Sequence, residues 1–383
     1  MITTDSRSHI ANDTDQSTES TKRMSFVSYL GRKRIPNLDG LRGIAVLLVL
    51  IHHVPMSSIS WIAHFQQYSK HGVSLFFVIS GYIVMTLMLR EFRNSGTIDT
   101  GGFLVRRCLR LWPLYYAILL LEAGLVYVAQ VYSPENQALF TDKLACYALY
   151  CSNWLETSGQ GPFFVSWSLA VEEQFYILLS LLLLMFRPGW IVLIFSILLL
   201  VKFTTVNFFN VDLSLLPWSI ILSYSEAIIL GVGLAFLLNH RWFYDMFNRA
   251  FAFRFLPAFL LIILSAFLLF GNLAYKSDLA AIAFYIVCAL LVGACVIRNE
   301  LPVLGGKVLS SIGLLSYGIY LMHMPILSAV KKLTMDPVLV FLCTLIIVLP
   351  LAWLSFRFFE EPIRHWGRKR MHGGWFTRLH FSS

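Results

Sequence analysis

Long apolar runs separated by short polar segments fill this chain from about residue 40 to residue 359. A helix that crosses a membrane needs about 20 mostly apolar residues. The pattern therefore predicts an all-α membrane protein with about ten transmembrane helices. We expect the spans at residues 40–57, 71–90, 113–132, 167–186, 189–203, 215–239, 255–271, 279–298, 308–330 and 337–359.

Three segments depart from this simple pattern. The run at 189–203 is short for a full span. Residues 101–112 (GGFLVRRCLRLW) are typical of a basic helix lying at the membrane interface. The long polar segment 133–166 predicts a short helix around 139–151, and one hypothesis is that it covers one end of the bundle as a lid.

Outside the apolar runs we expect two tails. Residues 1–34 are rich in Ser, Thr, Asp and Asn and predict a disordered cytoplasmic tail, with no signal peptide because no apolar run follows the early charges. Residues 367–383 predict a basic cytoplasmic tail. The segment 35–366 between them is expected to form one transmembrane domain.

Composition and charge agree with a membrane protein. Hydrophobic residues make up 57% of the chain and charged residues only 13%, far from the averages for soluble domains. The net charge of +9 comes from basic residues beside the spans, which does not indicate nucleic-acid binding. If the N-terminus is cytoplasmic, the inner segments hold 23 Lys and Arg and the outer loops six. This bias predicts that both termini face the cytoplasm.

An arginine and a histidine interrupt the first apolar run, IPNLDGLRGIAVLLVLIHH. An ionisable group inside a membrane costs roughly 2.5–3.5 kcal/mol, so it usually faces a protein interior. Arg42 and His53 are eleven residues apart, which brings them within ~20° of each other around the helix and ~16 Å apart along it. His52 points about 100° away. The alternative is that Arg42 reaches the headgroups and His53 only packs.

The fourth run begins SWSLAVEEQFY, in which Ser168 and Glu172 share a helix face that continues to Tyr176. In the orientation above, Glu172 and His53 lie at similar depths. A carboxylate beside an imidazole would orient it as a general base. The alternative is that Glu172 merely stabilises the start of its helix.

Further polar residues lie on other runs. Arg107 and Arg110 are three residues apart on one face, where guanidinium groups suit a phosphate, although ordinary charge anchoring is the alternative. Glu226 lies within the sixth run, and Tyr320 and His323 share a face of the ninth. Glu122 has no obvious partner. The six cysteines form no metal or disulfide pattern, and we expect no metal.

The motifs together are similar to those of a known family. LDGLRGIAVLLVLIHH, GVSLFFVISGYIV, FLVRRCLRLWPLYY, SWSLAVEEQFY, SYGIYLMHMP and FRFFEEPIR occur in this order. The chain resembles the acyltransferase family 3 integral membrane proteins, which move acyl groups, most often acetyl from acetyl-CoA, onto sugars and other hydroxyl-bearing acceptors. The resemblance places the family's Arg-x10-His pair on Arg42 and His53, its RxxR pair on Arg107 and Arg110, and its acidic residue on Glu172.

Two features depart from the family pattern. Ser223 stands where relatives often carry an arginine three residues before the acid matched by Glu226, so the arginine partner of that acid is missing at this position. Some relatives also carry a C-terminal esterase-like SGNH domain, which has no counterpart here, so a standalone member is expected.

The resemblance implies that acyl-CoA binds with its phosphates against Arg42, Arg107 and Arg110. His53, oriented by Glu172, would then activate an acceptor hydroxyl, or would itself carry the acyl group. The expected acceptor is a carbohydrate, a surface polysaccharide or its lipid-linked precursor at a bacterial inner membrane. A cytoplasmic small molecule such as a macrolide, a transporter and a non-catalytic scaffold are the alternatives.

Overall fold

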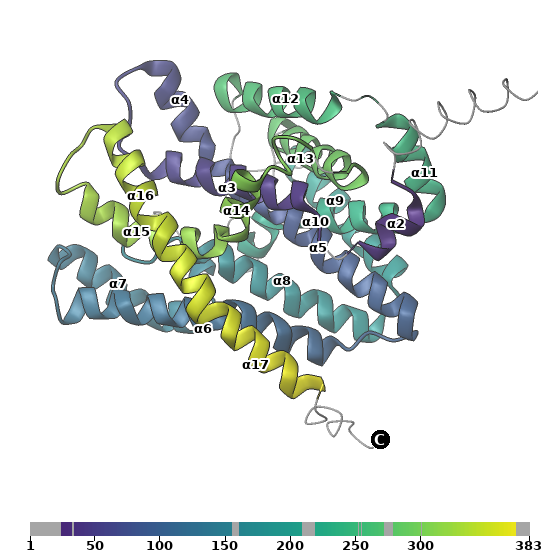
Figure 1. Ribbon diagram of the computed structural model, residues 1–383, viewed down its shortest axis with the longest axis horizontal. Helices are drawn as coiled ribbons and strands as arrows, with labels where there is room; N and C mark the ends of the chain where they lie inside the picture. Colours follow the sequence, from purple (N-terminus) through teal and green to yellow (C-terminus); the bar gives the residue numbers. More distant parts are fainter. Residues whose placement is uncertain are drawn as a thin grey trace, which may run out of the picture.

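The computed structural model describes residues 24–372, apart from residues 33, 155–160, 209–218, 252, 254, 272–278 and 300. Helices form nearly all of the described chain, and no strand occurs within it (Figure 1). The helices are α2 (Phe26–Gly31), α3 (Pro36–His53), α4 (Ser60–Tyr68), α5 (Gly72–Ser95), α6 (Thr100–Tyr127), α7 (Pro134–Ala148), α8 (Ser166–Met185), α9 (Pro188–Phe208), α10 (Ser219–Leu238), α11 (Arg241–Ala250), α12 (Leu256–Phe270), α13 (Leu279–Ile297), α14 (Lys307–Leu314), α15 (Ser316–Val330), α16 (Pro337–Ser355) and α17 (Glu361–His372). A π-helical turn, Phe356–Glu360, joins the last two.

The described chain contains six helical segments long and apolar enough to cross a membrane, and up to eight if each of two bent pairs counts as one span. The all-α membrane class is therefore confirmed, whereas the number ten stays a prediction. Helix α3 is not among the six. Its two charged residues and two terminal histidines lower the mean hydropathy of its 18 residues.

Helix α6 corrects one prediction. Residues 101–112 are not a separate interfacial helix, because a single helix of 28 residues runs from Thr100 to Tyr127 with Pro113 inside it. The Asp99 side chain accepts from the Gly102 N–H and starts the helix. Pro113 removes only one N–H from the helical ladder. The Tyr317 hydroxyl donates to the Leu111 carbonyl close by.

The other boundaries differ by smaller amounts. The predicted span 308–330 is divided at Leu315 into α14 and α15, which are bent by 71°. The predicted short helix at 139–151 is α7, which begins earlier because Ser133 caps it and Pro134 occupies its first turn.

The described part of the predicted N-terminal tail is folded rather than disordered. Helix α2 lies inside that segment, and its Tyr29 is fully buried. The Tyr29 hydroxyl lies 3.0 Å from that of Tyr82, and its ring stacks on Tyr244 of α11 at 5.0 Å. These contacts hold α2 against the bundle. At the other end of the chain, α17 continues to His372, into the predicted C-terminal tail.

Close helix contacts explain the glycines of the LDGLRG motif. A side chain at Gly40 would collide with the Leu304 carbonyl, and one at Gly43 would collide with the Leu309 carbonyl. Gly313 likewise faces the Asp39 carbonyl. These small residues let α14 approach α3 at backbone distance, and they fix the helix that carries Arg42.

The bundle has two ends, which different helices mark. Helix α7 lies at the left of Figure 1, and α2 and α11 lie at the right. Lys331, which follows α15, donates to the His53 carbonyl at 2.8 Å, so the last residue of α3 lies at the α7 end. We call the two ends the α7 end and the α2 end.

Candidate active site

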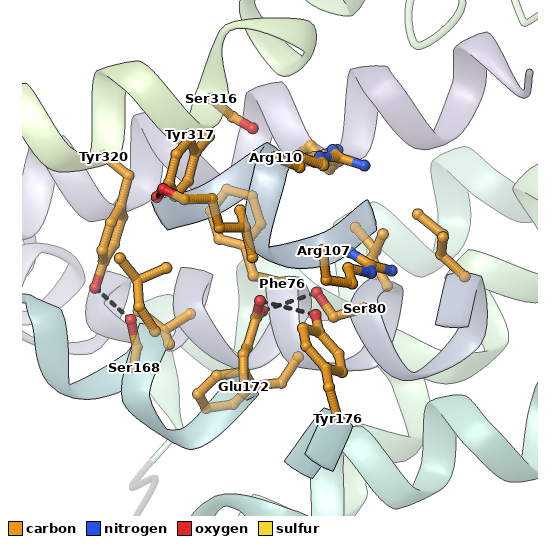
Figure 2. Close-up of a pocket in the computed structure, with 17 residues that line it drawn as sticks. Phe76, Ser80, Arg107, Arg110, Ser168, Glu172, Tyr176, Ser316, Tyr317 and Tyr320 are labelled. Carbon is orange, nitrogen blue, oxygen red and sulfur yellow. Dashed lines mark hydrogen bonds between the residues drawn. The ribbon is translucent and has the colours of Figure 1, made fainter. Parts of the chain in front are cut away.

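Three arginines from two helices line one narrow cavity in the middle of the bundle. Arg42 comes from α3, and Arg107 and Arg110 come from α6. The cavity has a volume of about 70 Å³. Figure 2 shows the two α6 arginines on one side and Tyr320 with Ser168 on the other. The remaining walls come from Val73, Phe76, Phe77, Ile79, Ser80, Ile83, Leu111, Leu169, Glu172, Tyr176, Ser316 and Tyr317.

This cavity carries an excess of positive charge. Arg110 interacts electrostatically with three like charges, those of Arg42, Arg107 and Arg364. The Arg107 guanidinium lies 4.7 Å from the Tyr176 ring, yet its buried Nη2 atom has no hydrogen-bond partner among the described residues. Like charges repel strongly where water is scarce. The site is therefore suited to an anion.

The start of α15 adds to this character. The helix begins at Ser316 on the cavity wall, and the buried Ser316 hydroxyl lacks a hydrogen-bond partner within the described chain. Free N–H groups at a helix start attract negative charge. Forked guanidinium groups favour phosphate in particular. The cavity thus combines three features that bind a phosphorylated ligand.

Glu172 belongs to this same cavity. Its carboxylate accepts from the Ser80 hydroxyl at 2.7 Å and from the Tyr176 hydroxyl at 2.9 Å (Figure 2). It also interacts electrostatically with Arg42. We expected Glu172 beside His53, but these contacts direct it toward α5 and the arginines. The similar membrane depths of Glu172 and His53 were not enough to predict which helix the carboxylate contacts.

His53 lies beside a second histidine. Its ring is 5.1 Å from that of His323 on α15. Its Nδ1 lies 2.8 Å from the Val49 carbonyl oxygen. A carbonyl can only accept, so Nδ1 carries the proton and Nε2 keeps a free lone pair. The orienting role expected of Glu172 is therefore filled by the backbone of α3.

His323 has the same arrangement. Its Nδ1 donates to the Tyr320 carbonyl, and its buried Nε2 has no partner among the described residues. The His52 ring also lies beside His53, at 4.9 Å, but its Nδ1 contacts a different group, the Gln66 carbonyl, at 2.9 Å. The two adjacent histidines therefore have different hydrogen-bond partners, and the choice of His53 over His52 stays a prediction. His53 and His323 form a pair whose unprotonated nitrogens are available for chemistry.

A hydrogen-bonded pair links the cavity to the histidines. The hydroxyls of Ser168 and Tyr320 lie 2.7 Å apart, and both residues line the cavity. The Tyr320 ring is 5.6 Å from that of His323. The helix face that carries Ser168 and the helix face that carries Tyr320 were predicted separately, and this hydrogen bond joins them.

Glu226 is the one predicted site residue that lies elsewhere. It forms an ion pair at 2.8 Å with Lys202 of α9, and both side chains are buried. The cation comes from α9, in place of the arginine that Ser223 lacks. One expectation is corrected: the charge count above included Lys202 among the six outer-loop residues, but it lies inside a helix that continues to Phe208.

Ser80 was not among the residues predicted for the site. It lies in GVSLFFVISGYIV, one of the motifs that carry the family resemblance, and that motif was the available signal. The described residues contain no group of three or more His, Cys, Asp or Glu side chains arranged to hold a metal ion.

Comparison with known proteins decides the family. A family model described as an acyltransferase domain, that of acyltransferase family 3, matches residues 35–357. The chain belongs to acyltransferase family 3. No solved structure matches it significantly.

Among its relatives, O-acetyltransferase OatA of Staphylococcus aureus strain NCTC 8325 is 28% identical over 364 residues, which cover 88% of this chain and 58% of OatA. A provisionally named O-acetyltransferase of S. aureus strain COL is 28% identical over 395 residues, covering 91% of this chain and 60% of the relative. The chain therefore spans about three fifths of the length of the relatives it matches.

The motifs shared with acyltransferase family 3 converge in space. Those on α3, α5, α6, α8 and α15 all contribute residues to the arginine cavity or the histidine pair. These segments lie far apart in the chain, from Arg42 to His323. The family pattern thus describes one site.

Proposed function

We propose that this protein is a membrane O-acyltransferase that moves an acyl group, most simply acetyl, from acyl-CoA to a hydroxyl of a carbohydrate. The acceptor is a cell-surface polysaccharide or its lipid-linked precursor at a bacterial inner membrane. The observation that carries the proposal is the phosphate-suited cavity that leads through Ser168 and Tyr320 to two histidines with free nitrogens. The printed names of the relatives, O-acetyltransferases, support it.

The donor is held at the arginines. Its phosphates contact Arg107 and Arg110, with Arg42 and the start of α15 completing the charge. A volume of about 70 Å³ has room for a few water molecules or an acetyl group but not for a nucleotide. The adenosine part therefore stays outside, the phosphates lie at the arginine edge of the cavity, and only the acyl end of the arm reaches toward Tyr320. Glu172 balances the arginine charge and positions Ser80 and Tyr176.

His53 acts on the acceptor. Its Nε2 takes the hydroxyl proton while the hydroxyl oxygen attacks the thioester carbonyl carbon. The new C–O bond forms, the C–S bond breaks, and the imidazolium returns its proton to the CoA thiolate. General base catalysis of this kind contributes about 10²- to 10⁴-fold. The second route, transfer through an acyl-histidine, uses the same Nε2 and would leave an acylated His53 detectable by mass spectrometry.

The membrane orientation follows from charge. The basic residues before α3 and around α6 lie toward the α2 end, and we place that end in the cytoplasm. Acyl-CoA then arrives at the arginines from the cytoplasmic side, and the α7 end faces outward. Reporter fusions test this: a fusion at Asp142 on α7 should report outside, and one after His372 should report inside.

The transfer itself is tested with purified protein in nanodiscs, [14C]acetyl-CoA and the envelope glycan fraction of the source cells. We expect label in the glycan with wild-type protein and almost none with His53→Ala. Equal labelling with both proteins would contradict the proposal, as would acetyl-CoA binding without any transfer.

A further inference from the structure

A second and larger cavity lies at the α7 end. Its volume is about 780 Å³, within the range of about 300–1,000 Å³ typical of small-molecule sites. It is bounded by the end of α6, the start of α7, the segment 161–164 and the second half of α15. The lining residues are Glu122, Leu125, Val131, Tyr132, Glu135, Asn136, Gly161, Pro162, Phe163, Phe164, Met324, Pro325, Ser328, Ala329, Lys332 and Leu333. We call it the α7 groove.

The α7 groove adjoins the histidine pair. The ring of Phe164, on its wall, lies 5.6 Å from the ring of His53. Met324 and Pro325, which also line it, directly follow His323 in the chain. The two imidazoles therefore lie between the arginine cavity and the α7 groove. A molecule in the groove could present a group to the histidines without entering the arginine cavity.

The polar centre of the groove is a carboxylate. Glu122 is only 1% exposed and accepts from the Tyr132 hydroxyl at 2.8 Å. A carboxylate has about four acceptor positions, so one hydroxyl partner leaves capacity for more. Burial and the Glu122 carboxylate raise the pKa of Tyr132, which keeps its hydroxyl protonated as a donor. No partner and no role for Glu122 could be predicted from the sequence.

The rest of the lining suits a polyhydroxylated ligand. Glu135 and Asn136 add acceptor and donor groups from the first turn of α7. Phe164, which is only partly buried, supplies an aromatic ring that can stack on the C–H face of a sugar. Lys332, the only cation among the described lining residues, donates to the Val131 carbonyl at 3.2 Å. Acidic and aromatic groups without an arginine disfavour a phosphorylated donor and favour neutral hydroxyls.

The groove wall also contains strained backbone. Phe163 has φ of 63°, and Gln130, directly before the lining residue Val131, has φ of 49°. Non-glycine residues rarely adopt such angles, and where they persist they cluster at ligand and active sites. Phe163 is nevertheless buried against Tyr115 and Tyr147, which hold it in place. The fold thus maintains this wall at an energetic cost.

We infer that the α7 groove binds the carbohydrate acceptor, with Glu122 and Tyr132 hydrogen-bonding its hydroxyls and Phe164 stacking on a sugar ring. This inference rests on the proposed function and names the place and chemistry of its second substrate. The bound sugar directs one hydroxyl past Phe164 toward Nε2 of His53. The acyl arm approaches the same histidine from the arginine side.

Two conservative variants test this site. Glu122→Gln keeps an oxygen that can accept from Tyr132 but removes the charge, and Tyr132→Phe removes only the hydroxyl. Asp142→Asn is the matched control, because Asp142 is an exposed acid on α7 outside the groove lining. Transfer from [14C]acetyl-CoA is measured in nanodiscs while the envelope glycan fraction and the acetyl-CoA concentrations are varied separately.

We expect each groove variant to raise the KM for the glycan fraction about tenfold, the scale for losing a hydrogen bond to a charged group. The KM for acetyl-CoA should not change, and Asp142→Asn should match wild type in both. If both variants leave the glycan KM unchanged while wild-type transfer is intact, the groove assignment is wrong and the proposed function stands. If wild-type protein binds acetyl-CoA but labels no glycan, the inference falls together with the proposed function. Should Glu122→Gln not insert into membranes, Tyr132→Phe alone gives the same decision.

Discussion

The arginine cavity and the α7 groove differ in almost every property. The first has a volume of about 70 Å³ and three guanidinium groups in its walls, whereas the second has about 780 Å³ and a buried carboxylate at its centre. The first is suited to a phosphate and the second to neutral hydroxyls. Donor and acceptor therefore need not compete for one pocket. They can meet at the histidine pair, which adjoins Phe164 of the groove through His53 and Tyr320 of the arginine cavity through His323.

The largest expected effect comes from replacing His53 of the histidine pair. His53→Ala should lower turnover by about 10²- to 10⁴-fold, because it removes the base that serves both cavities. His52→Ala should have a much smaller effect, since its ring faces the Gln66 carbonyl. Transfer rates in nanodiscs, with protein amounts matched by fluorescence-detected size exclusion, provide the test. An inactive His52→Ala beside a normal His53→Ala would remove His53 from the mechanism.

The buried ion pair of Glu226 and Lys202 lies outside both cavities and should affect stability and not substrate binding. Glu226→Ala should lower stability by about 3–5 kcal/mol, because it leaves Lys202 buried without its ion-pair partner. The two KM values of the surviving folded protein should stay close to wild type. Thermal unfolding in detergent and substrate titrations measure both quantities. A selective rise in the KM for either substrate would show that Glu226 serves a substrate site.

The arginines offer a matched test within one helix. Arg107→Ala or Arg110→Ala should raise the KM for acetyl-CoA about ten- to hundredfold, since a hydrogen bond to a charged group contributes about 1.5–3 kcal/mol. Arg106 is the control because it is exposed and contacts Glu91 at 3.4 Å and Asp99 at 3.8 Å. Its replacement by alanine should leave both KM values unchanged. If all three variants behave alike, these arginines only anchor the helix.

The smallest expected effect lies at the end of α3. Lys331 donates to the His53 carbonyl at 2.8 Å and steadies the last turn. Lys331→Met should lower turnover by no more than about fivefold, since a partly exposed charged contact contributes about 1 kcal/mol or less. Both KM values should stay constant. A loss as large as that of His53→Ala would mean that Lys331 takes part in the chemistry.

The sequence predicts some of this site because its residues share faces of single helices. Arg107 and Arg110 lie on one face of α6 and both line the arginine cavity, so their spacing was sufficient. The shared face of Arg42 and His53 stays a prediction, since only Arg42 lines that cavity. The partners of Glu172 and His53 were not predictable in the same way. Periodicity shows which residues share a face, but packing decides which helix that face meets. Glu172 meets Ser80, and His53 meets His323.

Some predicted helix boundaries were wrong for a related reason. An apolar run ends where its hydropathy falls, but α9 continues past Lys202 because Glu226 compensates its charge from a neighbouring helix. Helix α6 continues through Pro113, although the sequence pattern predicted two separate segments that meet there, 101–112 and 113–132. The α7 groove could not be found from sequence, because four separate segments build it. Glu122 acquires its partner only when Tyr132 folds back against α6.

The central claim is that donor and acceptor occupy separate cavities that meet at His53. The most direct test is the double variant Arg107→Ala with Glu122→Gln, compared with each single variant by steady-state kinetics in both substrates. Independent sites give additive effects. We predict that the double variant has the acetyl-CoA KM of the first single variant and the glycan KM of the second. The claim is contradicted if either single variant raises both KM values to a similar extent.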